Sequence, residues 1–284
     1  MFWSCSNFAA MKVLTHLIIY AAALTASTVH AAEPISYMDL VQKADDAIKD
    51  AHWHEAEEML VEAMRTEPAN PGNILLMSNL GMVRYYSGQD RLALQTLNDA
   101  HVMAPQSVTV LQNRAKVLLG MNKSVEAYDD FSTALGLDSL LTETRFYHAM
   151  LALEQGLDTV CAQDIRFMER HAAKSRYTNL AAATYHRLTG KYAEAIPYLS
   201  RLIETEKAAE HYAARAECEM KTGDLNSAAM DIAEAIALEP TDGDLYLQRA
   251  ILNKMRYRPD DAQADGKRAM DLGVPTEKVR SLLR

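Results

Sequence analysis

The sequence predicts an all-α protein that is built from a repeated helical hairpin. Its 284 residues are 49% hydrophobic, and alanine, leucine, glutamate and methionine, which favour helix, dominate. The 11 glycines and 8 prolines stand at intervals, as turns between helices require. No long β-branched run alternates with period two, which argues against a sheet. The sequence also repeats itself at about 34 residues, a period typical of stacked helical repeats.

Small, large and proline residues carry the repeat at fixed positions. Counted from residue 37, the small positions 8, 20 and 27, the large position 24 and the proline position 32 hold Ala44, Ala56, Ala63, Leu60 and Pro68. In the same order, the stretch from 74 holds Gly81, Ala93, Ala100, Leu97 and Pro105, the stretch from 108 holds Ala115, Ala127, Ala134, Phe131 and Ser139, and the stretch from 209 holds Ala216, Ala228, Ala235, Ile232 and Pro240. Small residues allow two helices to approach closely, and proline ends the second helix.

This pattern resembles the tetratricopeptide repeat. The resemblance implies a right-handed solenoid over residues 37–284, with about seven hairpins that start near 37, 74, 108, 142, 176, 209 and 243 and a short capping helix at 276–284. The fourth and seventh hairpins depart most from the pattern, so we expect the solenoid to bend or loosen there. Gly266 occupies a large position, which predicts a poorly packed last hairpin covered by Leu282 and Leu283.

The N-terminus resembles a secretory signal peptide over residues 1–31. Lys12 precedes an apolar stretch from Val13 to Leu24, and Val29 and Ala31 suit a cleavage site. Cleavage after Ala32 is the near alternative, Met11 is the expected start, and a first helix or retained anchor is the competing interpretation. We therefore expect an exported protein, in the periplasm of a Gram-negative bacterium, with no membrane span in the mature chain.

The net charge indicates which partners are disfavoured, and the cysteine positions indicate whether a disulfide can form. The formal net charge of −9 disfavours nucleic acid, which attracts basic surfaces. Two cysteines remain after the expected cleavage, Cys161 and Cys218, and they lie two repeats apart. That separation exceeds what a disulfide can bridge, so both are expected to be free and buried.

The family resemblance implies a concave groove lined by the first helix of each hairpin. The groove candidates for binding a protein or peptide are Asn79, Met82, Tyr86, Gln112, Asn113, Lys116, Tyr147, Met150 and Arg187. Asn79 and Asn113 share position six of successive hairpins, so they are expected to stack and to pair with the backbone of an extended peptide. The alternative is that they bond neighbouring groups of the protein itself. The carboxylate clamp known in the family is mostly missing, since Asp45 occupies one of its positions.

No catalytic, metal or cofactor constellation is evident. His52 and His54 are too close in sequence to converge on a metal from one helix, and Trp53 between them is expected to pack in the turn. No phosphate-binding loop occurs. The sequence therefore predicts a non-enzymatic binding scaffold in the cell envelope. A structural subunit that docks by its convex face or terminal repeats is the alternative, and a glycan-binding module or enzyme is a remote one.

Overall fold

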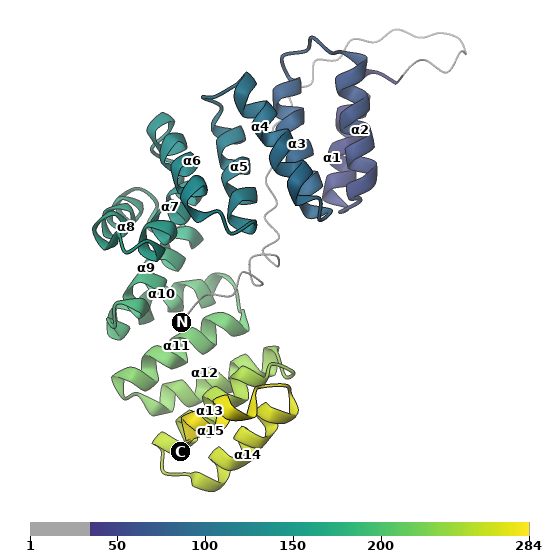
Figure 1. Ribbon diagram of the computed structural model, residues 1–284. Coiled ribbons are helices and arrows are strands. Elements are labelled where there is room, and N and C mark those ends of the chain that lie inside the picture. The colour runs from purple at the N-terminus through teal and green to yellow at the C-terminus, as the bar shows by residue number, and fades with distance from the viewer. Residues whose placement is uncertain (1–34, 284) are drawn as a thin grey trace. The chain divides into compact units, whose positions relative to one another are not determined.

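The computed structural model describes residues 35–283 of the chain. The signal peptide expected over residues 1–31 lies outside the described residues. Within them the secondary structure is entirely helical (Figure 1). The helices are α1 (Tyr37–Lys49), α2 (Trp53–Thr66), α3 (Asn73–Tyr86), α4 (Asp90–Met103), α5 (Val108–Gly120), α6 (Ser124–Leu137), α7 (Thr142–Glu154), α8 (Asp158–Ala172), α9 (Arg176–Leu188), α10 (Tyr192–Thr205), α11 (Ala209–Thr222), α12 (Leu225–Leu238), α13 (Gly243–Met255), α14 (Pro259–Asp271) and α15 (Thr276–Leu283).

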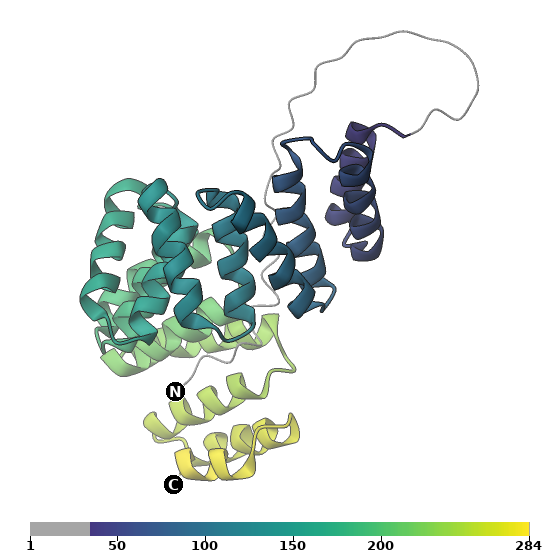
Figure 2. The ribbon, with the colours of Figure 1, turned by 45° about the horizontal axis from the view of Figure 1, so that its top comes forward.

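Consecutive helices pair into seven antiparallel hairpins, and α15 packs on the last of them (Figures 1 and 2). The second helix of one hairpin also packs against the first helix of the next, as between α2 and α3 and between α10 and α11. This nearest-neighbour stacking is that of a helical solenoid. The predicted fold class, with about seven hairpins and a short capping helix, is confirmed.

The described residues divide into two compact units, 35–144 and 145–283. We call them the N-terminal unit and the C-terminal unit, and each is described by itself. The division falls in the first turn of α7, the first helix of the fourth hairpin. This hairpin is one of the two in which we expect the solenoid to bend or loosen.

The core of each hairpin follows the small and large positions of the repeat. Ala93, Leu97 and Ala100 of α4 are fully buried. Gly81 of α3 faces them so closely that an added Cβ would lie 2.5 Å from Leu97 Cγ. No side chain larger than hydrogen fits at this position without displacing Leu97, which explains the small residue there in physical terms.

The turn inside each hairpin requires one residue with positive φ. Glycine fills this position in the second, fourth, fifth and sixth hairpins, and Asn122 in the third. Ala51 and Tyr257 fill it in the first and seventh, with φ of 56° and 58°. A left-handed backbone is unfavourable for residues with a side chain, including alanine and tyrosine. Tyr257 is 93% exposed, so its side chain gains little packing within the hairpin.

The expectation of a poorly packed last hairpin is wrong. An added Cβ on Gly266 would lie 2.6 Å from Leu283 Cδ1 and 3.2 Å from Val279 Cγ1. Side chains of α15 therefore fill the space beside Gly266. In the other hairpins, a large residue of the second helix fills the equivalent space. Val279 is buried, whereas Leu282, which was expected to cover the hairpin, is 42% exposed.

Candidate functional site

The nine predicted groove residues are divided between the two units. Asn79, Met82 and Tyr86 lie on α3, and Gln112, Asn113 and Lys116 lie on α5, all in the N-terminal unit. Tyr147 and Met150 lie on α7 and Arg187 on α9, in the C-terminal unit. The structure thus brings six of the nine into one set on two neighbouring helices.

One face of α3 carries a strip of four residues, Leu75, Asn79, Met82 and Tyr86, which we call the α3 strip. Spacings of four, three and four residues place these side chains on one side of a helix. Leu75 and Tyr86, at its two ends, are 51% and 50% exposed, and Asn79 and Met82 between them are half-buried. The Tyr86 ring stacks on Trp53 of α2, with centroids 5.1 Å apart, so Trp53 packs as expected.

The two asparagines differ in their bonding. The Asn113 amide donates a 2.9 Å hydrogen bond to Ser78 Oγ of the preceding hairpin. Within residues 35–283 the Asn79 side chain has no hydrogen-bond partner. The predicted row of two amides open to a peptide is therefore reduced to one, and for Asn113 the alternative of an internal bond is the correct interpretation.

The other polar candidates on α5 also bond within the protein. Gln112 Nε2 donates to Thr144 Oγ1 at 2.5 Å, and Lys116 Nζ lies 2.8 Å from Glu143 Oε1. Both contacts tie α5 to the first turn of α7. A peptide would have to break them before it could use these groups, and breaking such contacts costs binding free energy.

In the C-terminal unit, Tyr147 is buried, with 6% of its surface exposed. Its ring packs edge-on against Phe146, with centroids 5.2 Å apart. Arg187 pairs with Glu217 of the next hairpin, and Met150 is half-buried. None of the three presents the open surface that the α3 strip does.

A recurring contact between a basic side chain and an aspartate joins the two helices of four hairpins, and the sequence had not led us to expect it. Residue seven of the hairpin, an arginine or histidine, meets an aspartate sixteen residues later. The pairs are Arg114–Asp130 at 2.6 Å, His148–Asp164 at 2.5 Å, Arg215–Asp231 at 2.7 Å and Arg249–Asp265 at 2.6 Å. The fourfold recurrence of this spacing in the sequence was the signal that could have revealed it.

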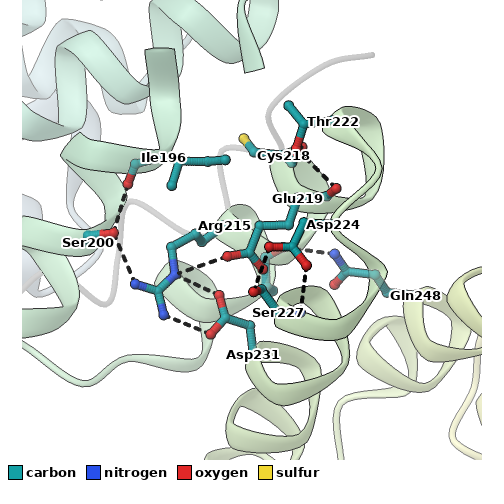
Figure 3. A network of polar contacts seen from close by, with 11 residues as sticks. Ile196, Ser200, Arg215, Cys218, Glu219, Thr222, Asp224, Ser227, Asp231 and Gln248 are labelled. Carbon is teal, nitrogen blue, oxygen red and sulfur yellow. Dashed lines mark hydrogen bonds and ion pairs between the residues drawn. The ribbon is translucent and has the colours of Figure 1, made fainter. Parts of the chain in front are cut away.

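Figure 3 shows the Arg215 member of this set. Its guanidinium donates two 2.7 Å hydrogen bonds to Asp231 and one of 3.0 Å to Ser200 of the preceding hairpin. Glu219, one turn further along α11, is buried beside the same aspartate. Burial, with the negative charge of Asp231 second, raises the pKa of Glu219 to about 7. The equivalent residue of the seventh hairpin, Asn253, donates a 2.9 Å hydrogen bond to Asp265.

These charged groups join the helices of a hairpin to each other. A strongly shifted pKa marks functional sites and structural ion-pair networks alike. Here Glu219 lies inside a hairpin, next to the arginine that joins its two helices. The cysteines are equally inert: both are free and buried, as expected, and burial raises the pKa of Cys161 to about 12 and of Cys218 to about 11. Thiolates, which are the reactive form, are then scarce.

The described part of the chain contains no group of three potential metal ligands. His52 and His54 instead lie near Glu55 and Glu58, at 3.8 Å and 3.4 Å. No helix between residues 35 and 283 is long and apolar enough to cross a membrane.

Solved structures with the same fold identify the repeat. A tetratricopeptide repeat protein from Parabacteroides merdae is 27% identical, with a TM-score of 0.66 over 87% of this chain and 97% of that one. PilW, described as a type IV pilus biogenesis factor, is 16% identical, with a TM-score of 0.64 over 72% and 94%. YrrB, described as having an unusual peptide-binding site, is 17% identical, with a TM-score of 0.52 over 62% and 92%. No protein-family profile and no curated protein matches the chain.

Proposed function

The chain is a tetratricopeptide-repeat protein, and we propose from this that it is a non-catalytic scaffold that holds another protein through the groove of its N-terminal unit. Stacked hairpins present a preformed surface, which lowers the entropy cost of binding a partner. A peptide-binding site is described for YrrB, a protein of the same fold. The repeat itself specifies a surface and not a chemistry, so the partner has to be inferred from the residues on that surface.

The α3 strip is the observation that carries this proposal. Leu75 and Tyr86 are long apolar side chains left half exposed on a helix whose other faces are packed. Covering the exposed half of each would contribute on the order of 1 kcal/mol. The Asn79 amide between them supplies a donor and an acceptor, which favours a partner that can satisfy both.

The neighbouring first helices suggest the chemistry of the partner. On α1 the residues in the same register include Asp45 and Lys49, which form an ion pair. On α5 Lys116 is paired with Glu143. The apolar strip is therefore bordered by paired charges on both sides. We expect a protein segment with an apolar face and mixed polar flanks, which binds through its side chains more than through a free carboxylate or exposed backbone.

The cell envelope is the proposed location. The proposal rests on the N-terminal sequence, where Lys12, the apolar stretch 13–24 and the Val29–Ala31 pattern resemble a signal peptide of ordinary length. Fusion of residues 1–36 to a reporter that is active only outside the cytoplasm tests this part separately. A reporter that stays inactive would place the scaffold elsewhere without affecting the groove.

The groove is tested by affinity capture from an envelope extract. The variant Leu75→Ser/Tyr86→Ser removes the two exposed ends of the strip and leaves the buried face of α3 intact. We expect it to recover at least tenfold less of the specific partner than the unaltered protein. Asn79→Ala is expected to weaken capture by a smaller factor, since one hydrogen bond contributes about 1 kcal/mol.

The matched control is Val102→Ser/Leu140→Ser. These side chains are also exposed and also lie in the N-terminal unit, but they are not part of the α3 strip. The control should capture the partner as the unaltered protein does. Equal recovery by the strip variant and the unaltered protein would exclude the groove of the N-terminal unit as the binding surface.

A further inference from the structure

The turn between α13 and α14 carries a tyrosine that the fold does not need. Tyr257 is 93% exposed and has a φ of 58°, in the position that glycine or asparagine fills in five other hairpins. A left-handed backbone disfavours a bulky side chain, and no packing in the described chain offsets that cost. Strained residues persist where function requires them, so the side chain points to a contact outside the hairpin.

Cations surround this tyrosine. Lys254, Arg256 and Arg258 lie within five residues, a segment we call the Tyr257 turn (residues 254–258). Arg256 and Arg258 make no ion pair with any residue between 35 and 283. The two carboxylates that follow, Asp260 and Asp261, lie in the first turn of α14, where the helix dipole favours negative charge. Exposed tyrosine and arginine side chains are the residues that contribute most at protein interfaces.

The complementary charge lies at the other end of the same chain. Residues 37–68 contain nine carboxylates and three lysines or arginines. The first hairpin therefore has a formal net charge of −6, out of −9 for the whole chain. Three of its glutamates, Glu55, Glu58 and Glu62, follow a spacing of three and four residues along α2 and are exposed. Each lies near a basic side chain of the same hairpin, respectively His52, His54 and Arg65, in contacts that are themselves open to solvent. They share one face of the helix, which we call the acidic face of α2.

From this complementarity we infer that the Tyr257 turn of one molecule docks on the acidic face of α2 of a second copy, in a head-to-tail contact. Arg256 and Arg258 pair with the glutamates, and the Tyr257 ring covers the apolar parts of their side chains. The two patches are different, so the contact is heterologous. An anionic membrane is the less favoured occupant, because the net charge of −9 repels the rest of the molecule from it. This contact does not depend on the groove.

Sedimentation velocity of the purified protein tests the inference. In 50 mM salt the weight-average sedimentation coefficient should rise with protein concentration, and 500 mM salt should weaken association at least tenfold. Arg256→Glu/Arg258→Glu and Glu55→Lys/Glu58→Lys should each weaken it to a similar extent. A mixture of the two variants should form a heterodimer again, because the altered turn of one then complements the altered face of the other.

Two controls separate docking from folding. Lys207→Glu/Lys221→Glu makes the same charge change at exposed lysines of the C-terminal unit and should leave association unchanged. Tyr257→Gly relieves the strained backbone, so it should unfold at the same or a higher temperature yet associate less. Ala51→Gly relieves the equivalent strain in the first hairpin and should not weaken association.

Two outcomes would overturn the inference. One is a protein that remains monomeric in 50 mM salt at all concentrations tested. The other is equal association of the Arg256→Glu/Arg258→Glu variant and the lysine control. Co-sedimentation with phosphatidylglycerol vesicles runs in parallel: if the turn variant loses vesicle binding while no protein self-associates, the turn binds lipid headgroups and the head-to-tail contact is wrong.

Discussion

At the scale of single residues, Glu219 is a carboxyl group whose pKa burial raises to about 7. It is buried on α11 with its carboxyl group beside Asp231, and Arg215 pairs with Asp231 and not closely with Glu219, from which it is 3.9 Å distant. Asn253 in the equivalent position of the seventh hairpin donates a hydrogen bond to its aspartate. A protonated Glu219 can act in the same way, whereas an ionised one adds a second buried negative charge.

Stability should therefore fall as pH rises through neutrality. The pKa of Glu219 is about 7 in the folded protein and about 4.3 in an unfolded chain. The folded state therefore binds the proton of Glu219 more tightly than the unfolded state does. The stabilisation is complete below about pH 4.3 and is lost as pH passes 7. Glu219→Gln, which is neutral at every pH, should be more stable than the unaltered protein at pH 8, by on the order of 2 kcal/mol.

Urea unfolding followed by circular dichroism at pH 5, 6, 7 and 8 measures this difference. The matched control is Glu234→Gln, which changes an exposed glutamate on the next helix and should leave the pH profile as it is. If the difference between Glu219→Gln and the unaltered protein is the same at pH 5 and pH 8, then Glu219 does not titrate in this range.

At the same scale, the sequence predicted groove candidates from their repeat positions, but it did not indicate which of them bond within the protein. The repeat position of Asn79 and Asn113 is identical, so no periodicity distinguishes them. The difference arises because the Ser78 hydroxyl, on the preceding hairpin, accepts a hydrogen bond from the Asn113 amide. Such contacts depend on how neighbouring hairpins stack, and the spacing within one hairpin contains no information about them.

At the scale of secondary-structure elements, α15 is part of the last hairpin's core. Val279 and Leu283 fill the space above Gly266. Gly266→Leu should therefore destabilise the complete chain by roughly 1–3 kcal/mol, through overpacking. In a chain that ends at Pro275 the same substitution should stabilise, because leucine then fills the empty space and favours helix over glycine.

Thermal unfolding of the four proteins measures this coupling. Gly136→Leu is the control, since an added Cβ there meets no atom within 4 Å, and its effect should be the same with and without α15. A loss of stability on Gly266→Leu that is equal in both backgrounds would mean that α15 does not fill the space.

The ion pair between the seventh and the twenty-third position of a repeat, such as Arg215–Asp231, joins the two helices of a hairpin. Removing one partner of a buried pair leaves the other charge uncompensated. We expect Asp231→Ala to cost roughly 3 kcal/mol, and we expect Glu62→Ala, which breaks the exposed pair with Arg65, to cost less than about 1 kcal/mol. Urea unfolding measures both, and similar losses would show that the pair at Asp231 is no stronger than a surface pair.

Helices and turns were the best-predicted elements. Small residues, large residues, prolines and turn glycines recur at one register, and each has a steric reason that acts within one hairpin. The error at Gly266 has the opposite origin. Its partner side chains come from α15, outside the hairpin, so a rule that describes one repeat could not reveal that the space was filled.

At the scale of the whole molecule, stacked repeats communicate mainly with their neighbours. A substitution in the sixth hairpin should therefore lower the stability of the C-terminal unit more than that of the N-terminal unit. Trp53, stacked on Tyr86, reports on the N-terminal unit in a protein that begins after the expected signal peptide and so lacks the other tryptophan, Trp3. Asp231→Ala in this background should lower the urea midpoint of the circular dichroism signal by more than that of Trp53 fluorescence.

Ser227→Ala, one turn before Asp231 on the same helix, serves as the control, since it removes an exposed capping contact with Asp224 and leaves the buried pair intact. Midpoints that fall by the same amount in both signals would mean that the two units unfold as one cooperative body, contrary to this prediction.

The glycine at position 266 also bears on how such an array can evolve. Repeat proteins lengthen when a unit is duplicated and its copy stacks on the original. A copied seventh hairpin would bring Gly266 into a place where the following hairpin, not α15, must cover it, and the gap left by the missing side chain would weaken that junction. Duplication of an earlier hairpin, with its large residue intact, carries no such penalty, so the first six hairpins are the better templates for growth.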